Sequence, residues 1–406
     1  MKRDRPIDSE AKNGRKLRLL LHGIDGCVPY MTPSTLEKYF PASDDNLWIG
    51  LAVRDTCVMP VFQEKKKVHK KNKNRNLETS SSTKASVAKK PSGYGFLPTK
   101  PDSWLEPYNR ITVPTFDPIA DNKKGSYTCT NKGVSVWTPH GRQKLTPGAY
   151  NEASLALDAE YTLSLFDIDD EEGNAKRQEK AEQRNKEWFE DLGKACSGQT
   201  DRKLWAPALI PNLINNPSAS LAIAQSDNKK ASGIALIGKW HSKLEKLLES
   251  LEYENVTMLS TDSLVEVLEI ASGSAVNMIG TNLPQQWAKK KHALAIDFSF
   301  DESSKRVKSD KKDQLDLNSD GCIDMSSKVF ARDARPLVPG RSTSLACADS
   351  MFSRAYIHHL VVAQEILAEI LLFAHNLHQM LELLKAFREA KDPSALKEFI
   401  MKQLKI

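Results

Sequence analysis

A regular alternation of apolar strand-like runs and helix-like segments covers much of the sequence and most restricts the folds open to it. Runs typical of buried strands occur at residues 162–166, 205–210, 234–237, 256–259 and 276–279. Helical patterns separate them; in residues 241–251, the leucines fall on one face at helical spacing. Strands alternating with helices of this length indicate a parallel sheet built from βαβ units. Repetition this frequent predicts an α/β fold, a (β/α)8 TIM-type barrel with inserted loops, with a doubly wound sheet as the alternative.

The N-terminal third fits the start of the same pattern. Residues 17–21 and 47–53 predict strands, and Thr32 followed by Pro33 predicts the capped start of a helix between them. Beyond them, the patterns predict a strand at 134–137, helices at 147–157, 175–192 and 263–271, a helix start at 217–224, and a loop at 301–320.

The chain becomes helical near its end. Ser353 is expected to open one long apolar helix that carries His375 and Asn376 near its middle, and a break is expected at Asp392-Pro393. We therefore divide the chain into a barrel at residues 1–335, interrupted by a basic insertion at about 64–92, and a helical C-terminal subdomain at 336–406.

Composition excludes several classes of protein. No apolar run of the 406 residues approaches the roughly 18 residues that a membrane-spanning helix needs, and the mean hydropathy is −0.47. The N-terminus is charged and lacks the apolar core of a secretory signal. Six scattered cysteines form no disulfide framework, which is typical of a reducing compartment. These features predict a cytoplasmic protein.

Several strings in the C-terminal two thirds carry a family resemblance. They are Arg-Ala-Tyr-Ile-His-His-Leu after Ser353, the pair His375-Asn376, and the segments 136–147, 176–192, 261–279 and 336–340. In this order they resemble the tRNA-guanine transglycosylase (queuine tRNA-ribosyltransferase) family, and most of all the non-catalytic accessory branch of the eukaryotic enzyme. Residues 1–130 match only loosely.

The resemblance implies base exchange on tRNA, which needs a carboxylate that attacks the ribose C1′ and a second carboxylate for proton transfer. In the family the nucleophilic Asp lies four residues before a Pro; Pro284 anchors that match here, so the nucleophile's position is Gly280. Asn277 stands where another carboxylate is expected. The family's Asp-Ser-Gly-Gly string is missing near residues 121–127, and no Gly-Gly pair follows residues 205–210.

Four carboxylates remain near the places where the family keeps its chemistry. We interpret them as members of solvated turns, not as catalytic groups: Asp121, Asp167, Asp169 and Asp170. The missing nucleophile, the missing Asp-Ser-Gly-Gly string and the missing Gly-Gly pair are three separate losses, and together they favour a pseudoenzyme with no catalytic residue of its own.

The resemblance also implies a zinc site of three cysteines and one histidine, a closed tetrahedral set. Counting back from His375 with the family spacing puts Ser344, Ala346 and Asp349 on the cysteine positions, or Leu345, Cys347 and Ser350 after a shift of one residue. Zinc stays open as a cofactor, with Cys347 and His375 as candidate ligands, helped by Asp349 or His359. The favoured interpretation is a buried Cys347 and a hydrogen-bonded His375, and we expect His358, His359 and His378 to have packing roles.

A basic segment contributes much of the net charge of +6. Its lysines are Lys65, Lys66, Lys67, Lys70 and Lys71, followed by a Ser-rich stretch. The favoured interpretation is a solvated surface loop; the alternative is a tether for the tRNA backbone, since lysines near phosphates add salt-dependent affinity.

The resemblance therefore predicts a subunit that pairs with a catalytic transglycosylase as a heterodimer and helps it to exchange guanine for queuine at the tRNA wobble position. The chain would supply dimer surface and tRNA-backbone contacts, and association with the mitochondrial outer membrane is a further implication. Two alternatives stay open. One is an active base-exchange enzyme with a relocated nucleophile, and the other is a stand-alone RNA-binding or scaffold protein.

Overall fold

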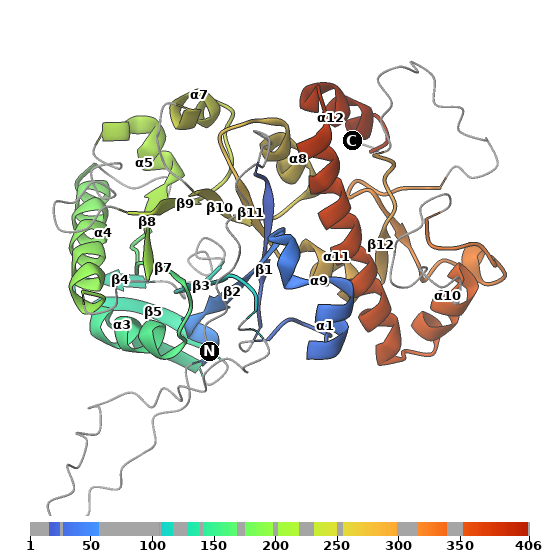
Figure 1. The fold of residues 1–406 in the computed structure, drawn as a ribbon, viewed down its shortest axis with the longest axis horizontal. Helices are drawn as coiled ribbons and strands as arrows, with labels where there is room; N and C mark the ends of the chain where they lie inside the picture. The colour runs from blue at the N-terminus through green and yellow to red at the C-terminus, as the bar shows by residue number, and fades with distance from the viewer. Residues whose placement is uncertain are drawn as a thin grey trace, which may run out of the picture.

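The computed structural model describes residues 16–24, 27–56, 105, 107–116, 128–138, 141–168, 175–197, 202–218, 231–249, 255–298, 315–338 and 352–404. Its centre is a closed barrel of parallel strands (Figure 1). The barrel strands are β1 (Arg18–His22), β2 (Leu47–Ala52), β3 (Arg110–Val113), β7 (Tyr161–Leu163), β8 (Lys203–Leu209), β9 (Gly233–Ile237), β10 (Asn255–Thr261) and β11 (Met278–Thr281).

Consecutive barrel strands pair in chain order, and β1 pairs with both β2 and β11 to close the ring. The register is continuous except between β10 and β11, where it shifts between Met258 and Thr261. Inside, Trp48, Tyr161 and Trp205 come from three strands and contact one another near the strands' amino ends. The predicted (β/α)8 fold is confirmed.

Helices surround the barrel and follow most of its strands (Figure 1). They are α1 (Pro33–Tyr39), α3 (Pro147–Ala156), α4 (Ala175–Ala195), α5 (Ile210–Asn215), α7 (Lys243–Glu249), α8 (Leu264–Ser272) and α9 (Leu283–Lys289), with the short 3-10 turns η1 (Ala42–Asp44), η2 (Val53–Thr56) and η5 (Lys328–Phe330). Hydroxyl caps begin three of them, because Thr32, Thr146 and Ser263 each accept from the backbone N–H three residues on.

The predicted strand at 134–137 lies outside the barrel, which corrects its place in the alternating pattern. It belongs to β5 (Gly133–Thr138), the middle strand of an antiparallel sheet with β4 (Thr128–Thr130) and β6 (Gly141–Leu145). The barrel takes β3 instead, a short strand that the sequence did not reveal. A second small sheet pairs β12 (His292–Leu294) with β13 (Cys322–Asp324).

The expected single long helix from Ser353 is wrong, because two helices occupy that stretch. They are α10 (Arg354–Val362) and α11 (Ile366–Glu389), and Gln364 between them has a left-handed backbone with φ of 57°. Ser353 caps α10 as expected, and Asp392 caps α12 (Pro393–Met401) at the predicted break.

The C-terminal helices pack directly on the barrel. Helix α11 contacts α9, β12 and β1, and α12 contacts α8 (Figure 1). Near the end of α11, Arg388 Nη1 donates to the Leu17 carbonyl at 2.7 Å, just before β1. The boundary at residue 335 stays a prediction. No helix among the described residues is long and apolar enough to cross a membrane.

Candidate functional site

The carboxyl ends of the barrel strands are the first place to seek a site, because (β/α)8 enzymes carry their active sites there. Gly280 is in β11, one residue before its end, and His22 ends β1. Both are buried. Thr261 at the end of β10 donates from Oγ1 to the Gly280 carbonyl at 3.1 Å, so strands β10 and β11 are joined at this point by a side chain.

The backbone of β10 crowds Gly280. A Cβ atom built on Gly280 would lie 2.0 Å from the Leu259 carbonyl oxygen, 2.7 Å from the Leu259 carbonyl carbon and 2.9 Å from the Met258 oxygen. The crowding coincides with the register shift of β10. Any side chain at this position, a carboxylate included, would therefore require β10 to move.

A stacked pair of rings fills the same end of the barrel. The His22 imidazole stacks on the Phe116 ring with centroids 3.9 Å apart and an interplanar angle of 12°. Phe116 in turn lies so close to Gly50 of β2 that a Cβ there would be 2.4 Å from its ring. Side chains thus occupy space at the carboxyl ends of β1 and β2 where a base-binding pocket would need an opening.

His22 is held neutral in this position. Its Nε2 lies 3.0 Å from the Leu259 carbonyl oxygen. The pKa of His22 is lowered to about 3, mainly by burial; the hydrogen bond to Leu259 raises it in part, and the Arg54 charge contributes to the lowering. A neutral ring that contacts a carbonyl through Nε2 carries its proton there and donates it. His22 therefore holds in place, through this hydrogen bond, the Leu259 carbonyl that crowds Gly280.

Asp167 is not in a solvated turn, which corrects the prediction. Its side chain is fully buried and accepts from Arg177 Nη2 at 2.6 Å, Arg177 Nη1 at 2.7 Å and Arg184 Nη1 at 2.6 Å. Its backbone N–H donates to Asn185 Oδ1 at 2.6 Å. Because both oxygens of the Asp167 carboxylate accept from guanidinium groups, the geometry favours a structural role.

Helix α11 uses His375 and Asn376 to hold the β12 backbone. His375 Nε2 lies 2.8 Å from the Leu294 carbonyl, and Asn376 accepts from the Leu294 N–H at 2.8 Å and donates to the His292 carbonyl at 3.0 Å. His358 Nδ1 lies 2.9 Å from the Met325 carbonyl. These contacts agree with the packing role expected of His358 and with the hydrogen-bonded role expected of His375. His359 is exposed, so the packing role expected of it is wrong.

The structure does not test the zinc interpretation as a whole, because one of its candidate ligands lies outside the described residues. The described part of the chain contains no group of three His, Cys, Asp or Glu side chains that could hold a metal, and the Nε2 atom of His375 already faces a carbonyl oxygen. We therefore derive no function through a metal. Cys347 and Asp349 lie outside the described residues, as do Asp121, Asp169, Asp170 and the five lysines Lys65, Lys66, Lys67, Lys70 and Lys71.

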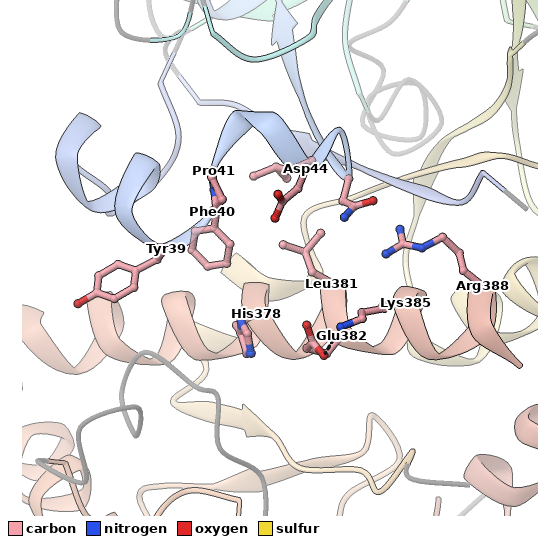
Figure 2. A pocket seen from close by; sticks show the side chains of 11 residues that line it. Tyr39, Phe40, Pro41, Asp44, His378, Leu381, Glu382, Lys385 and Arg388 are labelled. Atoms are coloured by element: carbon pink, nitrogen blue, oxygen red, sulfur yellow. Dashed lines mark ion pairs between the residues drawn. The ribbon is translucent and has the colours of Figure 1, made fainter. Parts of the chain in front are cut away.

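A groove on the outer wall of the barrel lies between α11 and the segment that runs from the end of α1 to the start of β2 (Figure 2). Tyr39 and Phe40 line one side and His378 and Lys385 the other. Its remaining lining residues are Pro41, Asp44, Asn46, Leu47, Leu381, Glu382 and Arg388. Because Leu47 begins β2, the groove is near the amino ends of the strands, away from the end where barrel enzymes place their chemistry.

Exposed apolar side chains gather on α10 and the start of α11. Ile366 is 69% exposed, Val362 64%, Tyr356 38% and Leu367 36%, and Phe352 stacks on Tyr356 with centroids 5.4 Å apart. We call these five residues the α10–α11 patch. On the same two helices, Leu360, Leu371, Leu372, Leu384 and Phe387 are buried.

Comparisons with known proteins agree on one family. The model of the family described as queuine tRNA-ribosyltransferase matches residues 120–405. The queuine tRNA-ribosyltransferase accessory subunit 2 of Trichoplax adhaerens is 25% identical over 280 residues, covering 66% of this chain and 68% of that protein. Its counterpart of the same name in Culex quinquefasciatus is 26% identical over 273 residues, covering 63% of this chain and 60% of that protein. For the Homo sapiens protein of that name the identity is 24% over 328 residues, covering 71% and 76%.

Proposed function

This chain belongs to the queuine tRNA-ribosyltransferase family, and from that premise we propose that it is the non-catalytic subunit of a heterodimer that exchanges guanine for queuine at the tRNA wobble position. Relatives named as accessory subunits of that enzyme support the assignment. The catalytic partner supplies the nucleophile and the proton-transfer group, and tRNA is the shared substrate.

The crowding of Gly280 is the observation that carries the non-catalytic assignment. The family mechanism needs a carboxylate at this position, and the Leu259 carbonyl lies where the first atom of its side chain would be. The His22–Phe116 stack fills the neighbouring space. A relocated nucleophile would need an accessible carboxylate near this end, and Asp167, the described candidate that the sequence singled out, is paired with two arginines.

The α10–α11 patch supports a partner subunit. Four large apolar side chains within residues 356–367 are exposed, and exposed apolar patches often mark protein interfaces. Aromatic residues such as Phe352 and Tyr356 are enriched at the centres of such interfaces. We propose that the catalytic subunit covers this patch.

Three earlier expectations stay predictions. They are tRNA-backbone binding by the Lys65–Lys71 lysines, zinc binding with Cys347 and His375, and a cytoplasmic location with association at the mitochondrial outer membrane. Elemental analysis of zinc in the purified chain tests the metal directly.

A three-way exchange assay tests the proposed function. Replacement of guanine by labelled queuine in tRNA is measured with this chain alone, with the catalytic subunit alone and with the two mixed. We expect no exchange from this chain alone and a clear gain on mixing, together with co-purification. Exchange by this chain alone would identify an active enzyme, and the absence of both gain and co-purification would favour a stand-alone RNA-binding protein.

A further inference from the structure

The segment around the antiparallel β4–β5–β6 sheet carries basic residues and lacks acidic ones. Residues 122–151 contain Lys123, Lys124, Lys132, Arg142 and Lys144 and no Asp or Glu. With 52 acidic residues in 406, a stretch of this length would hold about four. The whole segment is therefore positive, and its described part is a folded sheet, not a loop.

The sheet turns one face inward and one outward. Val134, Val136 and Leu145 are buried, and the residues between them alternate to the other side. On that outer face Trp137 pairs directly with Arg142, and Ser135 pairs with Lys144. Side chains of directly opposed residues lie next to each other on the same face. We call Ser135, Trp137, Arg142 and Lys144 the Trp137 face.

Trp137 is half exposed, with 52% of its surface open to solvent. Trp48 and Trp205 in the barrel strands and Trp287 in α9 are by contrast buried. An indole kept at the surface beside two cations, on a segment without a carboxylate, has the features of a nucleic-acid platform, because any base can stack on an aromatic ring while cations contact its phosphates.

The sheet that carries the Trp137 face is anchored to helix α4. In the turn between β4 and β5, Asn131 Oδ1 accepts from Arg184 Nε at 3.0 Å and from Arg184 Nη2 at 2.6 Å. The same arginine is paired with the buried Asp167. The sheet is thereby fixed to α4, so its outer face presents Trp137 in a defined direction.

We propose that the Trp137 face binds a single-stranded loop of the tRNA, with one base stacked on Trp137 and the adjacent phosphates contacted by Arg142 and Lys144. The inference rests on the proposed function for the identity of the RNA. Two cations beside an exposed indole, on a segment without Asp or Glu, favour RNA over a protein partner, because protein interfaces combine both signs of charge with apolar contacts.

Fluorescence anisotropy of a labelled tRNA transcript, titrated with the full chain alone and with the two-subunit mixture, tests the proposal. Trp137→Ala should raise Kd about tenfold, and Trp137→Phe should restore most of the affinity, because loss of one base–aromatic stack is worth that much. Arg142→Gln combined with Lys144→Gln should lower the slope of log K against log salt by about 1.4, the value for two phosphate contacts on a single strand.

Lys243→Gln combined with Lys246→Gln on α7 is the matched control, because it removes two charges from another exposed surface. It should leave the Kd and the salt slope unchanged. Unchanged tRNA binding by Trp137→Ala, or no tRNA binding by the wild-type chain in either form, would overturn the proposal. The proposal would also be overturned if Trp137→Ala kept its RNA affinity but no longer co-purified with the catalytic subunit, because the face would then be a protein contact.

The titration of the chain alone separates this inference from the proposed function. If wild-type chain and catalytic subunit neither co-purify nor exchange bases, the proposed function fails. The effect of Trp137→Ala on tRNA affinity would still confirm or overturn the RNA-binding face.

Discussion

Adding a side chain at Gly280 should destabilise the barrel and restore no chemistry. In Gly280→Ala the new Cβ would start 2.0 Å from the Leu259 oxygen, so β10 must move. Overpacking of this kind costs about 1–3 kcal/mol. Moving the Leu259 carbonyl also removes the acceptor of buried His22, and an unsatisfied buried donor costs about 1–3 kcal/mol more. The two costs together come to roughly 2–6 kcal/mol.

Thermal unfolding measures this cost. An unfolding entropy of about 2.1 cal/mol/K per residue converts it to a decrease in Tm of about 2 to 7 °C for a chain of this length. Gly280→Asp should lower Tm further, because it also buries a carboxylate, and should show no exchange activity alone.

Gly148→Ala is the matched control, because a Cβ on Gly148 meets no atom within 4 Å. Gly148 lies in the first turn of α3, where alanine is preferred to glycine, so its Tm should stay the same or rise slightly. Equal Tm values for the two alanine variants would refute the crowding argument, and exchange by Gly280→Asp alone would refute the view that the site cannot hold a nucleophile.

Three further predictions concern groups on the same framework. Because the pKa of His22 is lowered to about 3, its neutral form stabilises the fold fully above the unfolded pKa of about 6.5, and that stability is lost as pH falls toward 3. In His22→Gln, the slope of the unfolding free energy against pH should decrease in this window by up to the equivalent of one bound proton. A slope identical to that of the wild type would contradict the account. Asp167→Asn should lower the free energy of unfolding in urea by about 3–5 kcal/mol, since it leaves two arginines without their carboxylate. The control Asp191→Asn, at an exposed pair with Lys194, should lower it by less than about 1 kcal/mol. Equal decreases in the two variants would contradict a structural role for Asp167. Ile366→Glu in the α10–α11 patch should abolish co-purification with the catalytic subunit at unchanged Tm, and Ile366→Leu should retain it; retention by both would place the interface elsewhere.

The barrel was predictable because parallel strands buried on both sides leave apolar runs in the sequence. Residues 205–210 and 256–259 are such runs, and both are barrel strands, β8 and β10. The strand at 134–137 was predicted but misplaced, because alternation identifies a strand and not its partners. β3 has only four residues, Arg110–Val113, too few for a clear pattern.

At the site, the sequence predicted only that the catalytic carboxylate is missing. The resemblance located Gly280, but the crowding by Leu259 depends on a register shift in β10 that arises from pairing with distant strands. Sequence reasoning missed His22 and Phe116, which meet only when β1 and the segment after β3 come together. The one available signal was a polar His22 directly after a run of leucines. Asp167 was misjudged because its partners, Arg177 and Arg184, lie on the following helix.

Trapping of the covalent intermediate tests the central claim most directly. The family reaction passes through a bond between a protein carboxylate and the ribose C1′ of the tRNA. Both subunits are mixed with labelled tRNA in the absence of the incoming base, quenched and separated under denaturing conditions. Because Gly280 offers no carboxylate, the label should migrate with the catalytic subunit alone. Label attached to this chain would contradict the account.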